Sequence, residues 1–285
     1  MSKNELPSAW QVRNQTFDWG DRTYLMGVLN VTPDSFSDGG LFHQPETAIV
    51  QARALIAAGV DILDVGGQST RPKAIEISLD EELERVLPII RAVRQESDVP
   101  LSIDTTRAAV AEAAIDAGAD IVNDISGATY DAEMLPVVAK LGVPIVLMHI
   151  RGTPQTMQQL TDYDDLIGDI LAFLKARIDA AIACGVDRSR IAIDPGIGFA
   201  KTYAQNLEIL RRLPEFHALG YPLLVGASRK SFIGHILNQP DPQQRVWGTA
   251  AACCAAIVGK ADLLRVHDVK EMKDVCRVAD TLFRN

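Results

Sequence analysis

Short runs of apolar residues alternate with stretches of helical periodicity along almost the whole chain. The clearest run begins at Tyr24 and ends at Asn30, and its lack of a polar face is typical of a strand buried on both sides. Further strands are predicted at 60–65, 99–104, 120–124, 143–149, 191–194, 222–225 and 261–267. Helices are predicted between them at 46–58, 80–95, 106–117, 132–141, 163–184 and 203–213, in the region up to 258, and after 267.

This order of elements predicts an α/β fold. Strands that alternate with helices form a parallel sheet, and eight such units that close on themselves form a (β/α)8 TIM barrel. The first helix should end at Gly59, and the second should begin with Asp80 as its N-cap. Because no change in composition divides residues 24–285, we expect them to form a single barrel domain.

The first 23 residues have a different pattern. Aromatic and polar residues alternate in 10–13 and 15–19, and a turn is expected at Gly20 and Asp21. This pattern predicts a short N-terminal β-hairpin. The chain is therefore divided into a hairpin extension, 1–23, and a barrel, 24–285.

Composition limits the partners and the compartment. The chain has 285 residues, 47% of them hydrophobic, and a net charge of −9, which argues against nucleic acid or an anionic membrane as a partner. It shows neither the pattern of a secretory signal nor an apolar run of about 18 residues. Cys184, Cys253, Cys254 and Cys276 stand in predicted helices without metal-ligand spacing and are interpreted as reduced core residues. We expect a cytoplasmic protein.

Polar residues gather where the predicted strands end. In a barrel these ends point to one face, which is where barrel active sites lie. Asp104, Asn123 and Asp194 follow apolar strands and should lie deep, where an unpaired carboxylate is costly. They favour a ligand rich in hydrogen-bond donors, such as a fused nitrogen heterocycle.

A second group of residues at the strand ends is cationic. Arg71, Lys230, Arg265 and His267 are expected to form a rim suited to phosphate or pyrophosphate. Asn30 offers an amide oxygen to Mg²⁺, which usually bridges substrate phosphates with only one or two protein ligands.

Some of these residues also have a purely structural interpretation. Asp104, Asp124 and Asp194 could each cap the helix that follows. His149 is expected to be a packed histidine rather than a catalyst. Arg229 is expected to brace the barrel rim through salt bridges.

Several motifs carry a resemblance to a known family. Residues 26–40, MGVLNVTPDSFSDGG, closely resemble the first signature of the dihydropteroate synthases, and residues 64–72, DVGGQSTRP, resemble the second. Residues 102–105, 123–125, 194–199, 228–231 and 265–268 also match in order and spacing, so that the resemblance covers 24–285. Two departures affect the second loop: Gln68 stands where the family often has Glu, and Lys73 where Gly is usual.

The resemblance implies a transferase of folate biosynthesis. Its reaction joins (7,8-dihydropterin-6-yl)methyl diphosphate to 4-aminobenzoate, giving 7,8-dihydropteroate and diphosphate. It implies that the pterin is bound by Asp104, Asn123, Asp194 and Lys230. It implies that the diphosphate is held by Thr70, Arg71, Arg265, His267 and, through Mg²⁺ as cofactor, Asn30. It implies an aminobenzoate pocket lined by Phe36, Pro72, Phe199 and Ser231.

The chemistry so implied is displacement at an activated methylene group. An aniline nitrogen is unprotonated near pH 7, so no strong general base is needed. The task is largely electrostatic, and it falls to Asp104, Lys230 and Arg265, which would stabilise a cation on the pterin and the departing diphosphate.

Two other functions compete with this one. A pterin-binding methyltransferase that presents methyltetrahydrofolate to a corrinoid partner would need the deep polar residues but not Thr70 and Arg71. A catalytically inactive scaffold would need neither group. The expected partners are the small-molecule substrates and a second copy of the chain. A second copy is expected because residues 249–258 have no polar face, so one side of that helix would otherwise expose apolar surface to water. The resemblance also points to a homodimer.

Overall fold

A computed structural model describes residues 8–31, 44–72 and 74–284. Within these ranges, eight parallel strands form one sheet. They are β3 (Tyr24–Asn30), β4 (Ile62–Gly66), β5 (Leu101–Asp104), β6 (Ile121–Asp124), β7 (Ile145–Met148), β8 (Ile191–Asp194), β9 (Leu224–Val225) and β10 (Leu263–Val266). Neighbours follow chain order from β3 to β8, and β10 joins β3 to β9. A parallel bridge between Ile193 and Leu223 brings β8 to the start of β9. The predicted TIM barrel is confirmed.

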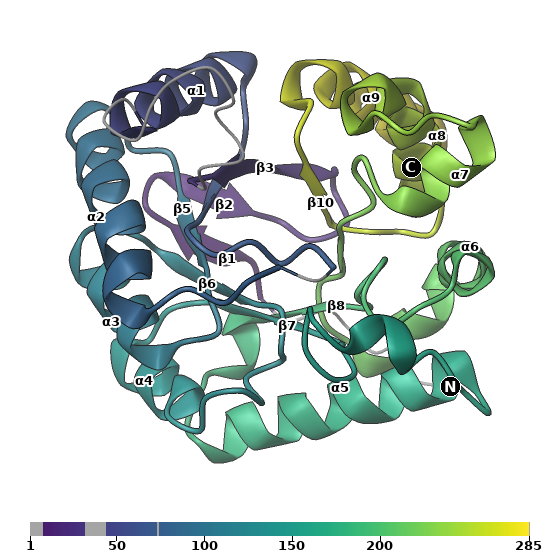
Figure 1. The fold of residues 1–285 in the computed structure, drawn as a ribbon, viewed down its shortest axis with the longest axis horizontal. Helices are drawn as coiled ribbons and strands as arrows, with labels where there is room; N and C mark the ends of the chain where they lie inside the picture. Colours follow the sequence, from purple (N-terminus) through teal and green to yellow (C-terminus); the bar gives the residue numbers. More distant parts are fainter. Residues whose placement is uncertain (1–7, 32–43, 73, 285) are drawn as a thin grey trace.

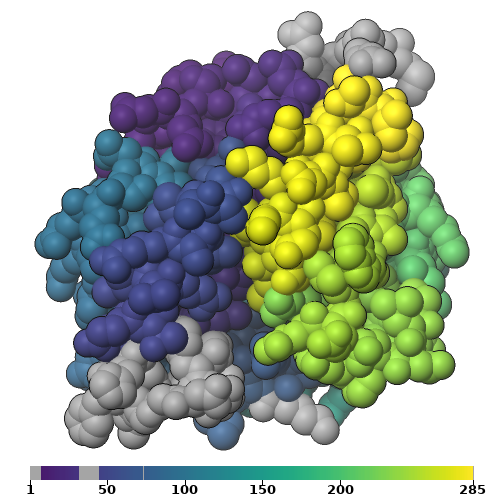
Figure 2. Space-filling view, turned by 90° about the horizontal axis from the view of Figure 1, so that it is seen from above, coloured from purple at the N-terminus to yellow at the C-terminus, as the bar shows by residue number. Residues whose placement is uncertain are grey.

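Helices surround this sheet (Figure 1). They are α1 (Gln44–Ala58), α2 (Leu79–Glu96), α3 (Ala108–Asp116), α4 (Met134–Leu141), α5 (Leu166–Ala183), α6 (Tyr203–Arg211), α7 (Ser231–Leu237), α8 (Val246–Val258) and α9 (Val269–Phe283). The last helix, α9, packs beside α1, so the last unit of the barrel meets the first (Figure 2). None of the helices in the described ranges is both long and apolar enough to cross a membrane.

The start of α2 corrects one prediction. Its N-cap is Ser78, whose side chain accepts a hydrogen bond from the backbone N–H of Glu81 at 3.1 Å. Asp80 lies inside the first turn, beside Glu81 and Glu82, where negative charge is favoured by the helix dipole. Ser and Asp are both good caps, so the sequence alone offered two equivalent starting points.

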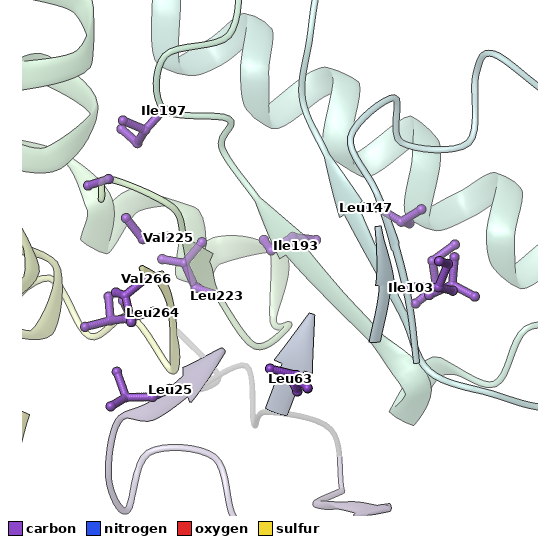
Figure 3. Close-up of a cluster of buried hydrophobic side chains, with 14 of the residues drawn as sticks. Leu25, Leu63, Ile103, Leu147, Ile193, Ile197, Leu223, Val225, Leu264 and Val266 are labelled. Carbon is purple, nitrogen blue, oxygen red and sulfur yellow. The ribbon is translucent and has the colours of Figure 1, made fainter. Parts of the chain in front are cut away.

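Alternation along the strands divides their side chains into two groups. One group points outward and packs under the helices; Leu63, Ile103, Leu147 and Ile193 belong to this main core (Figure 3). The other group points into the barrel. We call the end where the strands begin the floor and the end where they stop the mouth. Inward residues near the floor are mostly apolar, with the buried Ser102 of β5 as an exception, whereas those near the mouth are largely polar.

The N-terminal hairpin covers the floor. Strands β1 (Trp10–Val12) and β2 (Gln15–Phe17) pair antiparallel, which confirms the hairpin. Their buried side chains pack against the first inward layer of the barrel, which includes Met26, Ile62 and Ile121. The chain reverses at Arg13, which has φ 53°, and the expected turn at Gly20 follows the hairpin rather than joining its strands. With the floor sealed by aromatic residues, ligands have access from the mouth.

Candidate active site

Five polar side chains form the inward layer next to the mouth. They come from five different strands: Asp64 from β4, Asp104 from β5, Asn123 from β6, Asp194 from β8 and Arg265 from β10. Each occupies an inward position of its strand, two or three residues beyond the strand's first residue. All except the partly exposed Arg265 are at most 5% exposed. The expectation that Asp104, Asn123 and Asp194 lie deep is therefore confirmed.

Arg265 links two of these carboxylates. Its Nε donates to Oδ2 of Asp64 at 2.6 Å, and its Nη2 donates to Oδ2 of Asp104 at 2.7 Å. The amide of Asn123 donates to the same oxygen of Asp64 at 3.2 Å. Arg265 was expected on a cationic rim; its partly exposed side chain lies at the mouth but is engaged by two buried carboxylates. Two buried carboxylates need a cation between them, and the planar guanidinium fork can serve both at once.

The pKa values follow from this arrangement. Burial raises the pKa of Asp104 to about 7, and the attraction of Arg265 only partly offsets that effect. Burial acts to lower the pKa of Arg265, but the nearby Asp64 and Asp104 outweigh it and raise this pKa above its ordinary value. Arg265 is thus a permanent cation, while Asp104 is poised to gain or lose a proton near neutral pH.

Two carboxylate oxygens in this layer have no protein partner. Oδ1 of Asp64 and Oδ1 of Asp104 are buried and accept no hydrogen bond from the described residues. Leaving a buried acceptor unpaired costs about 1–3 kcal/mol, more when it is charged. Folded proteins retain such atoms mainly where function uses them. A ligand that brings N–H donors into the barrel would satisfy both oxygens.

Asp194, Lys230 and Phe199 form the opposite side of the layer. Oδ1 of Asp194 accepts from the backbone N–H of Gly196 at 2.7 Å, and burial raises the pKa of Asp194 to about 6. The ammonium of Lys230 lies 4.1 Å from the centroid of the Phe199 ring. Burial, with the nearby Arg265, lowers the pKa of Lys230 to about 8. Gly198 has φ 84°, a left-handed conformation that favours glycine, and a Cβ there would lie 2.9 Å from Cδ of Lys230.

A buried lysine that was not predicted from the sequence supports this loop. Lys201 donates to the carbonyl of Phe199 at 2.8 Å and lies 3.0 Å from Nδ1 of His149. Burial lowers the pKa of Lys201 to about 7 and that of His149 to about 2. The imidazole packs edge-on against Phe173 at 4.9 Å. His149 is therefore a packed, neutral histidine, as predicted. The only signal for Lys201 was its place two residues after Phe199.

His267 also differs from the expected cationic rim. Its Nδ1 lies 3.0 Å from Oγ of Ser228, within hydrogen-bond distance. Burial lowers its pKa to about 3, and the cations Arg229, Arg265 and Lys230 contribute to this effect. His267 is thus a neutral imidazole, because burial and the surrounding cations both disfavour its charged form. Arg229 forms an ion pair with Asp268 at the rim, as expected.

Asn30 ends β3 beside Gly66 of β4. A Cβ on Gly66 would lie 3.8 Å from Oδ1 of Asn30 and 3.5 Å from Oδ2 of Asp104, so the amide oxygen is near the polar layer. No cluster of three or more His, Cys, Asp or Glu side chains in the described ranges could hold a metal by itself. An amide oxygen such as that of Asn30 is a ligand type that a magnesium ion accepts, with its remaining ligands coming from phosphate and water.

A cavity of about 140 Å³ lies beside Asp104. Thr70, Thr105 and Tyr130 line it, so Thr70 shares this space with the buried carboxylate. Arg71 is exposed at the rim, close enough to His267 to contribute to its lowered pKa.

The residues expected in the aminobenzoate pocket differ in their exposure. Phe199 is buried beneath Lys230. Pro72 and Ser231, the first residue of α7, are both exposed. Phe36 lies outside the described residues.

The capping alternatives do not hold for these carboxylates. Asp104 is paired with Arg265, and Asp194 binds the backbone of Gly196. Oδ1 of Asp124 accepts from both the N–H and the hydroxyl of Ser126 at 2.7 Å, closing a turn well before α4. Burial raises the pKa of Asp124 to about 6.

Comparison with known proteins identifies the family. The family described as "Pterin binding enzyme" matches residues 26–267. A dihydropteroate synthase of Synechocystis sp. is 61% identical over 279 residues, which cover 98% of this chain and 96% of that protein. This chain belongs to the pterin-binding enzyme family.

Two solved structures agree. A dihydropteroate synthase from Clostridium difficile, crystallised in the presence of pteroic acid, has a TM-score of 0.89 and 45% identity, covering 94% of this chain and 100% of that one. A dihydropteroate synthase from Xanthomonas albilineans with 4-aminobenzoic acid has a TM-score of 0.90 and 41% identity, covering 97% of this chain and 98% of that one. The resemblance to dihydropteroate synthases is confirmed, and the competing methyltransferase and scaffold functions find no support among these relatives.

Asp64 belongs to the polar layer but was not among the predicted site residues. It is an aspartate at an inward position of an otherwise apolar strand, 0% exposed, and both Arg265 and Asn123 donate to it. Its place in the second signature was visible in the sequence. An acidic residue inside a buried strand was the signal that could have identified it, since such a group requires a partner.

Proposed function

We propose that the barrel mouth condenses (7,8-dihydropterin-6-yl)methyl diphosphate with 4-aminobenzoate, releasing 7,8-dihydropteroate and diphosphate. This is the transferase activity of a dihydropteroate synthase in folate biosynthesis. The observation that carries the proposal is the pair of unpaired buried oxygens, Oδ1 of Asp64 and Oδ1 of Asp104. A pterin presents N–H donors along its edge, which is the chemistry that these acceptors lack.

The pterin is placed in the polar layer. Asp194 and Asp104 accept its N–H groups, Asn123 offers both a donor and an acceptor, and Lys230 donates. Charged acceptors form stronger hydrogen bonds than neutral ones, so binding favours the ionised carboxylates. Arg265 keeps the carboxylate of Asp104 oriented through its 2.7 Å bond while leaving the second oxygen free.

The reaction breaks the bond between the methylene carbon and the diphosphate oxygen. The electron pair of that bond leaves with diphosphate, and the aniline nitrogen forms a new C–N bond and then loses a proton to water. Positive charge that develops on the pterin is stabilised by the carboxylate of Asp104. Arg71 and Lys230 stabilise the negative charge of the leaving group. His267, neutral in this site, donates or accepts one hydrogen bond and adds no charge.

A magnesium ion at Asn30 fits this scheme. When bound, it would neutralise charge on the leaving diphosphate. The amide of Asn30 would hold it, and Thr70 with Arg71 would hold the diphosphate itself. The aminobenzoate is proposed to lie near Phe199, Ser231, Pro72 and Phe36.

Direct product measurement tests the proposal. Purified protein with both substrates and Mg²⁺ should release one diphosphate for each dihydropteroate formed, and Asp104→Asn should reduce the rate by several orders of magnitude while the fold is retained. Tight binding of methyltetrahydrofolate without any diphosphate release would instead favour the methyl-presenting barrel. Activity unchanged by removal of Mg²⁺ would refute the role given to Asn30.

We also propose that the enzyme is a homodimer formed through α8. The outward face of this helix carries Trp247, Ala251, Ala255 and Val258 at helical spacing, and the two larger side chains are 77% and 51% exposed. Exposed apolar surface of this kind is typical of an interface. Light scattering at micromolar concentration should give twice the monomer mass, and Trp247→Glu should give the monomer. A wild-type monomer would refute the proposal.

A cytoplasmic location is proposed on the state of the cysteines. All four are free thiols, and Cys184 is exposed, which corrects the expectation that every cysteine lies in the core. An unpaired exposed thiol fits a reducing compartment. Cell fractionation would test the location.

A further inference from the structure

The loop between β4 and α2 carries Thr70 and Arg71 but has little apolar contact to hold it. Arg71, Pro72 and Glu76 are exposed, and Ile75 is 83% exposed although it is a large apolar residue. The loop therefore depends on polar contacts to its backbone. These contacts determine where the proposed diphosphate-binding side chains lie.

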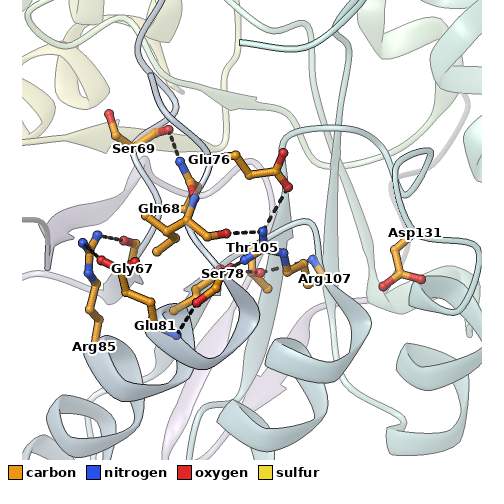
Figure 4. A network of polar contacts seen from close by, with 12 residues as sticks. Gly67, Gln68, Ser69, Glu76, Ser78, Glu81, Arg85, Thr105, Arg107 and Asp131 are labelled. Carbon is orange, nitrogen blue, oxygen red and sulfur yellow. Dashed lines mark hydrogen bonds and ion pairs between the residues drawn. The ribbon is translucent and has the colours of Figure 1, made fainter. Parts of the chain in front are cut away.

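One side chain supplies three of these contacts. The amide nitrogen of Gln68 donates to the carbonyl of Ser69 at 2.9 Å and to the carbonyl of Ile75 at 3.0 Å. Its amide oxygen accepts from the backbone N–H of Ile77 at 2.9 Å. The amide thus ties the outgoing start of the loop to its returning end, as Figure 4 shows around Gln68.

We call the three hydrogen bonds of the Gln68 amide the clamp. Two arginine side chains hold the backbone at its two ends. Arg85 donates to the carbonyl of Gly67 at 2.8 Å, just before Gln68. Arg107 donates to the carbonyl of Ile77 at 2.6 Å and to the buried Glu82 at 2.7 Å. Between the clamp points, the N–H of Ala74 donates to the carbonyl of Arg71 at 3.0 Å. The ends of the loop are therefore held by the barrel, and Gln68 sets the path between them.

We propose that Gln68 is a positioning residue whose amide holds Thr70 and Arg71 at the barrel mouth and thereby sets the affinity for the diphosphate of the substrate. This inference rests on the proposed function. Gln68 acts through the loop backbone, to which its amide is bonded.

The clamp requires an amide. Glutamine has two N–H donors and an acceptor oxygen, and here two carbonyls and one N–H face it. A carboxylate could accept from Ile77 but would place its second oxygen against the carbonyls of Ser69 and Ile75. In this chain, glutamine where the family often has glutamate is therefore matched to the backbone around it. Methionine has a similar length and offers none of these bonds.

The test compares Q68M and Q68E with wild type, using Q95M as the matched control. Gln95 is exposed on α2, away from the loop. Q68M should raise the KM for the pterin diphosphate, and the Kd for inorganic pyrophosphate with Mg²⁺, by about tenfold. A tenfold change corresponds to the net free energy of about one hydrogen bond, which would no longer help to order the loop. The kcat should change by less than about twofold, and Q95M should resemble wild type.

Q68E gives a readout that a general loss of structure would not give. Near pH 8 its KM should be raised like that of Q68M. As the pH is lowered towards 5, the new carboxyl group gains a proton and with it a donor, so the KM ratio to wild type should fall. The ratio for Q68M should not change with pH.

The rate of trypsin cleavage after Lys73 reports how firmly the loop is held, and it does not depend on catalytic activity. It should be faster in Q68M than in wild type and in Q95M. A Q68M enzyme with unchanged KM and unchanged cleavage refutes the clamp, as does an equal loss in Q95M. A wild-type protein that releases no diphosphate refutes the proposed function instead.

Discussion

The floor and the mouth of the barrel are built from the same strands by opposite chemistry. At the floor, inward positions are mostly apolar and the aromatic hairpin covers them, with Phe17 fully buried. At the mouth, the next inward positions carry carboxylates, a guanidinium and an amide, and two carboxylate oxygens have no partner. Along β4 the change takes place between Ile62 and Asp64. One end of the barrel interior stabilises the fold, and the other keeps unsatisfied groups for a ligand.

Removal of Arg265 should have the largest effect on the mouth. Arg265→Met would leave Asp64 and Asp104 buried without a counter-charge, which costs about 3–5 kcal/mol, and turnover should fall by at least about a thousandfold. Urea unfolding and product release measure the two effects. The control is Arg53→Met, whose exposed pair with Glu96 should contribute no more than about 1 kcal/mol. Equal losses in both variants would mean that burial of the pair has no special importance.

A change at the floor should affect stability without affecting chemistry. Phe17→Ala removes a fully buried ring and should cost about 3–5 kcal/mol of unfolding free energy. The kcat of the molecules that remain folded, measured well below the new midpoint, should match wild type. A large fall in kcat would show that the two ends of the barrel are coupled more strongly than the comparison suggests.

Asp194 tests the mouth without disturbing an ion pair. Asp194→Asn replaces an acceptor by an amide that must present one donor, and should weaken pterin binding by about 2–3 kcal/mol with stability almost unchanged. Calorimetric titration with pteroic acid gives the affinity. If the variant binds as tightly as wild type, Asp194 serves only to hold Gly196.

The pH dependence of binding should be the smallest effect. The pKa of Asp104 is raised to about 7 and that of Asp194 to about 6, both by burial, so in the ligand-free enzyme they ionise between about pH 5 and 8. Pterin affinity should therefore rise with pH over this range, by at most about tenfold per pH unit and group, and then level off. In Asp194→Asn the lower part of this rise should be absent.

The same shifts reduce the stability of the free enzyme. Between about pH 4 and 7 the folded state keeps protons that the unfolded chain has already released, because these pKa values are raised from 3.8. The contribution of the two groups to stability therefore falls as the pH rises through this window. A pterin that binds the ionised forms should reverse that trend, and thermal unfolding with and without ligand would show the difference.

The local pattern of apolar and polar residues predicted the strands and the burial of the residues at their ends. Strand positions follow from apolar runs, and the depth of Asp104 and Asp194 follows from their place at the ends of such runs. The position of Arg265 did not follow, because its partner Asp64 is distant in sequence and only barrel closure brings them together. The neutral state of His267 was also missed, since it depends on the burial of the ring and on the cations around it. The role of Gln68 depends on backbone groups that the loop places around its amide.

The last helix leaves the barrel on the side opposite the chemistry. Helix α9 runs from the mouth to the floor, and at its end Arg284 donates to the carbonyl of Gly20, next to the hairpin, at 3.2 Å. A tether added beyond this point would emerge under the barrel. Immobilised through such a tether on a sensor surface, or joined to a second enzyme, the protein would keep its mouth facing outward, and substrates could enter without passing the support.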